Sequence, residues 1–122
     1  MNHRFAGVVV AVMATWVSAW PVASAEPDAT TSDLRCLVSA AVMSSSSDDP
    51  KVKSAGQLAA IYFLGRLDGR TPDLDLEARF AEQAHAMTDA DVKSQLQSCG
   101  ATLSARGAAL QTIGKDLDQK QK

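Results

Sequence analysis

Two cysteines, Cys36 and Cys99, carry the most reactive side chains of this 122-residue sequence. They lie too far apart to form a C-x-x-C redox motif, so a redox-active pair is the less favoured interpretation. In an exported chain, an even number of cysteines predicts a structural disulfide. Such a bond would close a loop of about 62 residues and stabilise the fold by roughly 4 kcal/mol.

The remaining polar residues do not predict a catalytic or metal site. His85 is the only histidine after Ala25, and no second histidine or paired cysteine can complete the three or four ligands of a zinc site. The Asp73-x-Asp75-x-Glu77 pattern lacks the glycine and the distal glutamate of a calcium-binding loop. We therefore expect no enzyme activity and no cofactor, and we interpret the acidic groups as caps of helix N-termini.

The N-terminal segment, from Met1 to Ala25, has the three zones of a secretory signal peptide. A short basic start precedes an apolar run from Phe5 to about Trp20, and a small-residue triplet with Ala23 and Ala25 at its ends predicts cleavage after Ala25. The uninterrupted apolar stretch of about 15 residues is shorter than the roughly 20 that a membrane-spanning helix needs. We expect a periplasmic or extracellular protein without a stable membrane anchor after cleavage.

The segment after the signal holds about 97 residues, enough for one domain with a modest core. It carries eleven basic and fourteen acidic side chains, so it is mildly acidic. This charge disfavours nucleic acids and anionic membrane surfaces as partners. We expect a disordered leader over residues 26–31, a single domain over residues 32–118 and a charged tail over residues 119–122.

Apolar residues recur at helical spacing along this domain, which predicts an all-α fold. Four helices are expected, or five, in an orthogonal or bundle-like arrangement stapled by the disulfide. The first helix is expected to start with Thr31 or Ser32 as its N-cap. The second is expected to run from Pro50 to about Asp68, with Gly69 as its C-terminal stop.

The second helix has an uninterrupted apolar middle over residues 58–64, which predicts that it is the buried central helix. Gly56 and Gly65 are unfavourable within a helix and indicate the close approach of a neighbouring helix. A third helix is expected over residues 73–87. Thr88 and Asp91 have the spacing of a capping box at the start of the next helix.

The last segment contains a seven-residue repeat that places glycines and leucines in adjoining stripes on one helix. Its members are Gly100, Leu103, Gly107, Leu110, Gly114 and Leu117. Small residues allow close approach, so we expect either packing against the surface of the second helix that holds Gly56 and Gly65, or a homodimer. Arg106 takes the seam position that Cys99 and Ile113 occupy in neighbouring repeats, where its stem can pack while its head reaches water or an acid.

This layout resembles that of the small periplasmic acid-stress chaperones of enteric bacteria. The shared features are the export signal, Cys36 at the first helix, Cys99 in the fourth, and a lysine-rich end from Lys115 to Lys122. The loop between the cysteines is longer here. The resemblance implies a protein that gains positive charge at low pH, loosens or dissociates, and exposes apolar surface to unfolding clients.

The absence of a catalytic pattern favours a function by noncovalent contact with other proteins. A binding or chaperone-like module is the leading interpretation. The alternative is a dedicated inhibitor or immunity-type partner of a single envelope protein, and a small enzyme is the third. A chaperone should expose apolar surface conditionally, whereas a dedicated partner should copurify with one protein at neutral pH.

Overall fold

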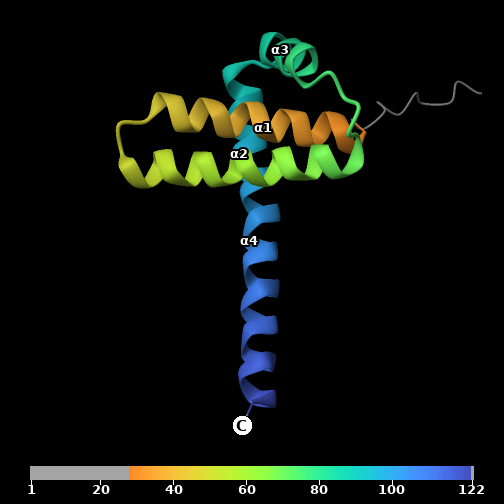
Figure 1. Ribbon diagram of the computed structural model, residues 1–122. Helices are drawn as coiled ribbons and strands as arrows, with labels where there is room; N and C mark the ends of the chain where they lie inside the picture. The colour runs from red at the N-terminus through yellow and green to blue at the C-terminus, as the bar shows by residue number, and fades with distance from the viewer. Residues whose placement is uncertain (1–27, 122) are drawn as a thin grey trace, which may run out of the picture.

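The computed structural model describes residues 28–121, which form four α-helices (Figure 1). In chain order they are α1 (Ala29–Ser46), α2 (Pro50–Arg70), α3 (Leu76–Ala86) and α4 (Asp89–Lys120). No strand occurs within this described part, so the prediction of a small all-α domain is confirmed. The predicted signal peptide, with its cleavage positions Ala23 and Ala25, lies outside the described residues.

Helix α1 begins earlier than predicted. Asp28 is the N-cap, and its Oδ1 accepts a hydrogen bond of 2.8 Å from the backbone N–H of Thr31. This bond satisfies one of the free N–H groups of the first turn and lowers the pKa of the Asp28 carboxyl. The prediction of Thr31 or Ser32 as N-cap is therefore wrong, and the end of the expected disordered leader belongs to the helix.

Helix α1 is the centre of the molecule, because each of the other three helices packs against it. Its buried residues are Asp33, Leu34, Cys36, Leu37, Val38, Ser39 and Ala40. The prediction that the second helix is central is wrong. In α2 the apolar residues run around the whole circumference, and only the side with Gly56, Ala59, Phe63 and Leu67 is buried.

Helices α1 and α2 lie side by side as a hairpin (Figure 1). A Cβ added at Gly56 would lie 2.8 Å from the backbone N of Ser44 and 2.9 Å from the carbonyl O of Ala40, so Gly56 marks a close approach to α1, as predicted. A Cβ at Gly65 would meet nothing within 4 Å, so the same prediction is wrong there. Helix α2 also continues through Gly69, the predicted stop, to a C-cap at Thr71.

The N-termini of α3 and α4 are fixed by local side-chain caps. Asp75 caps α3 by accepting a hydrogen bond of 3.1 Å from the N–H of Ala78, so the helix starts later than the predicted residue 73. At α4 the predicted capping box is confirmed. The N–H of Thr88 donates to Asp91 Oδ2 at 2.8 Å, and the N–H of Asp91 donates to Thr88 Oγ1 at 3.2 Å.

We predict that the capping box stabilises α4 at neutral pH and that this stabilisation is lost in acid. Hydrogen bonds from the backbone and the side chain of Thr88 lower the pKa of Asp91 below its ordinary 3.8. Because the pKa is lower in the folded state, this stabilisation is complete above about pH 4 and is lost as pH falls through the folded value. An NMR titration of the Asp91 carboxyl should find the lowered pKa, and Thr88→Ala should raise it part of the way back. An unchanged pKa in that variant would contradict the assignment.

Helix α4 is one continuous helix of 32 residues that crosses the α1–α2 hairpin and extends beyond it (Figure 1). Only its first half is anchored. Cys99 is buried, and Leu103 packs against the core cluster of Leu34, Leu37, Phe63 and Leu67. Residues 108–121 are all exposed. We call residues 104–120 the stalk. Its helix runs to Lys120, so the predicted tail from residue 119 starts within the helix.

Candidate functional site

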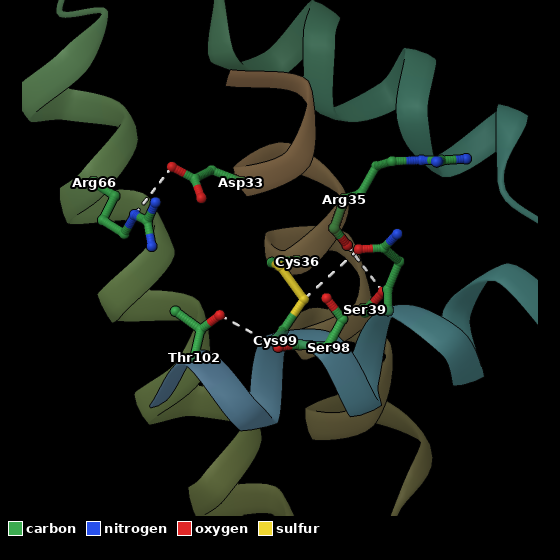
Figure 2. The surroundings of a disulfide bond; sticks show 9 residues. Asp33, Arg35, Cys36, Ser39, Arg66, Ser98, Cys99 and Thr102 are labelled. Atoms are coloured by element: carbon green, nitrogen blue, oxygen red, sulfur yellow. Dashed lines mark hydrogen bonds and ion pairs between the residues drawn. A yellow bond between two sulfur atoms is a disulfide. The ribbon is translucent and has the colours of Figure 1, made fainter. Parts of the chain in front are cut away.

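The disulfide between Cys36 and Cys99 forms at the point where α1 and α4 cross, and Figure 2 shows this joint. The two Cα atoms are 5.7 Å apart across a sequence separation of 63 residues, and both side chains are buried. This bond confirms the predicted pairing. Because both sulfur atoms are buried and bonded to each other, neither is a nucleophile or a metal ligand in this state.

A buried carboxylate beside this joint ties α1 to the far end of α2. Asp33 is 3% exposed, and its Oδ2 lies 3.1 Å from Arg66 Nε and 2.5 Å from Arg70 Nη1 (Figure 2 draws Asp33 and Arg66). Both arginines keep about a third of their side-chain surface exposed. The sequence did not indicate Asp33 as the partner of these two arginines. A separation of more than thirty residues leaves no local signal for such a pair.

The residues considered for metal binding in the sequence are not gathered in the described part of the chain. His85 is exposed on α3. Within residues 28–121 no three side chains of histidine, cysteine, aspartate or glutamate lie close enough to hold a metal ion. Asp49 accepts a hydrogen bond of 2.8 Å from the N–H of Lys51, which is the capping role predicted for the acidic residues at helix starts.

An apolar groove opens next to the disulfide, and we call it the disulfide groove. It has a volume of about 300 Å³ and lies between α1, α2 and α4. Its lining contains no charged side chain and consists of Cys36, Ala40, Met43, Ala55, Ala59, Phe63, Leu96, Cys99, Gly100, Leu103 and Ser104. Such a lining can accept an apolar side chain and offers no group for acid–base chemistry.

A second recess lies in the corner between α2 and the stalk, and we call it the arginine groove. It has a volume of about 470 Å³ and is lined by Tyr62, Arg66, Arg70, Arg106, Ala109, Leu110 and Ile113. The guanidinium group of Arg66 also lies 5.7 Å from the ring centre of Tyr62. The lining includes three arginines, of which Arg66 and Arg70 share the single buried carboxylate of Asp33, so the arginine groove is partly apolar and keeps an excess of positive charge.

The predicted glycine–leucine stripe lies along α4 but is only partly covered. Gly100 and Leu103 line the disulfide groove, whereas Leu110 and Leu117 are 69% and 53% exposed. An added Cβ at Gly100, Gly107 or Gly114 would meet nothing within 4 Å. The expected packing against the Gly56 and Gly65 surface is therefore wrong. Gly56 already faces α1, and α4 crosses the hairpin instead of running along α2.

Further large apolar side chains are exposed on the same two helices. On α2, Leu58 and Ile61 are 68% and 67% exposed, and Gly65 lies one turn from Ile61. We call these three residues the α2 face. On the stalk, Ile113 is 54% exposed and lies between Leu110 and Leu117 in the heptad pattern. We call Leu110, Ile113 and Leu117, together with Arg106, the stalk seam.

These features define a small all-α domain stapled by one disulfide, with two exposed apolar helix faces. Comparison with protein-family models, with curated proteins and with solved structures finds no significant match. No helix in residues 28–121 combines the length and apolar character of a membrane span.

Proposed function

We propose that this protein is an exported module that acts by noncovalent binding of other proteins. The observation that carries the proposal is the exposure of five large apolar side chains on the α2 face and the stalk seam: Leu58, Ile61, Leu110, Ile113 and Leu117. Grouped exposed apolar residues on a folded domain are typical of protein interaction surfaces. The proposal of export rests on the signal-peptide pattern and is supported by the disulfide, which requires an oxidising compartment to persist.

The α2 face is the part of this surface best suited to a partner or client. Gly65, between the large side chains and the end of α2, leaves room for a second helix to approach. The α2 face belongs to a helix that packs along α1 through the core, so we expect little ordering of its backbone on binding. A chaperone-like role, as the resemblance implies, and a dedicated envelope partner both use such a surface. They differ in the number of proteins bound and in the effect of acid.

Copurification from the protein's own envelope extract tests the proposal at neutral and acidic pH. The bait is the processed chain, compared with a Leu58→Glu/Ile61→Glu variant. We expect the double variant to lose most of the captured protein, because two carboxylates would be desolvated in the interface. Lys53→Glu, an exposed charge change on the same helix, is the matched control and should bind as the wild type does.

The outcomes separate the two roles. Many clients captured mainly in acid would support the chaperone-like role, and one protein captured at neutral pH would support the dedicated partner. Equal capture by the wild type and the α2-face variant would overturn the proposal for this face.

A further inference from the structure

We propose that the stalk seam binds a second copy of this chain, with the two stalks antiparallel. This inference rests on the proposed function, which uses two surfaces, the α2 face and the stalk seam. It names what binds to the stalk seam. It leaves the α2 face free for other proteins.

The stalk is an unfavourable structure for a helix without a partner. It begins directly after the last core contact, at Leu103, and no other described helix covers residues 108–120. The packed first half of α4 nucleates the helix, but beyond it each further turn depends on helix propensity alone, without the tertiary packing that supplies most helical stability in proteins. Gly107 and Gly114 each lower the helix propensity of the stalk further, because glycine is less favourable than alanine within a helix. Packing of the apolar seam against another helix would offset these terms.

The seam has the spacing of a coiled coil. Leu103, Leu110 and Leu117 follow one another at intervals of seven, and Arg106 and Ile113 lie three residues after the first two leucines. This alternation of three and four residues puts all five side chains on one stripe of α4. Leu103 packs on the core of its own chain, and the other four are exposed and can face a partner helix. A second copy carries the identical stripe, so the surface is complementary to itself.

The charges determine the orientation of the pair. A parallel, in-register dimer would place Arg106 against Arg106 of the second copy in the seam, where like charges repel. In an antiparallel pair, Leu110 can lie level with Ile113 of the second copy. Arg106 then lies level with Leu117 of the second copy and beside its Asp116. The stem of Arg106 can pack on the leucine while its guanidinium group pairs with the aspartate.

The same register accounts for the glycines. Gly107 then flanks Gly114 of the second copy, and the reverse pair forms by symmetry, so the two backbones can approach closely on that side. At the rise of an α-helix, the stalk is about 25 Å long. Two such helices bury less than the roughly 1,200 Å² of a standard interface, and contacts between the stalk tip and the arginine groove would add to this area. We therefore expect a reversible dimer that dissociates on dilution.

Sedimentation equilibrium of the processed, oxidised chain over a range of concentrations measures this dimer. Ile113→Glu should raise the dissociation constant by about 30-fold or more, as expected for a central apolar contact. Ala108→Glu, on the opposite side of the stalk, is the matched control and should leave the constant within about threefold. Circular dichroism of each variant verifies that the helices are retained. A chain that stays monomeric at every concentration would overturn the proposal.

Charge reversal tests the orientation. Arg106→Glu and Asp116→Arg should each weaken the dimer, and the double variant should recover most of the affinity. Only the antiparallel pair brings these two positions together between copies, so an absence of recovery would overturn that arrangement. These stalk variants should still capture envelope proteins through the α2 face. If the chain is monomeric in sedimentation, and only the α2-face variant loses capture of envelope proteins, the dimer is refuted and the proposed function stands.

Discussion

Removal of the Cys36–Cys99 disulfide is expected to lower the free energy of unfolding by about 4 kcal/mol. The bond closes a chain segment of more than sixty residues, so its loss restores a large conformational entropy to the unfolded state. The folded state also depends on it, because α4 reaches the rest of the molecule only through its first half. Small domains typically have a total stability of only about 5 to about 15 kcal/mol, so this is a large loss.

Urea denaturation of the wild type and of a Cys36→Ala/Cys99→Ala double variant measures the effect. Both cysteines are replaced so that no unpaired thiol remains to cross-link two chains. The wild type in reductant should behave like the double variant. The reduced wild type is the control, because it lacks the bond but keeps the side-chain packing of the two sulfur atoms. A decrease of less than about 1 kcal/mol, well below the usual contribution of a disulfide, would show that the helix contacts alone hold α4 in place.

Gly56→Ala should destabilise the fold by about 1 to 3 kcal/mol, the usual range for overpacking a close contact. The added methyl group would lie 2.8 Å from the backbone N of Ser44 and 2.9 Å from the carbonyl O of Ala40. Backbone atoms cannot rotate away as the end of a side chain can, so α1 and α2 must separate. Their contact is the most extensive one between any two helices, and its loosening spreads through the core.

Gly65→Ala is the matched control on the same helix and should have the opposite sign. Its Cβ would meet nothing within 4 Å, and alanine is favoured over glycine within a helix by roughly 0.5 to 1 kcal/mol. Both variants can be measured by urea denaturation of the oxidised protein. A stabilising Gly56→Ala would mean that the hairpin is more loosely packed than the contacts of Gly56 indicate.

The features that the sequence predicted correctly have local causes. Helical spacing of apolar residues specifies helices, and Asp49 with Pro50 and Thr88 with Asp91 start α2 and α4 through bonds within one turn. The disulfide followed from there being only two cysteines to pair. The first N-cap was wrong because Asp28 and the threonines and serine after it are all good capping residues. The residue types alone do not determine which of them becomes the N-cap.

The predictions that were wrong concern which helices pack against each other. Apolar residues on all sides of a helix, as in residues 58–64, indicate that it can be buried on all sides. They do not determine how many other helices pack against it. Helix α1 is central because the other three helices all pack against it, and its buried Asp33 pairs with two arginines near the end of α2. The heptad repeat of α4 likewise identified a face without identifying what covers it.

The last core contact of α4 falls at Leu103, and this position divides the helix into two parts with different tolerance to change. Substitutions before it alter a packed interior and are constrained by volume and polarity. Residues 108–121 are all exposed, so substitutions there are expected to have little effect on whether the chain folds. A single helix thus has a packed stretch and an exposed stretch, and an engineer could exchange the exposed one without redesigning the packed one.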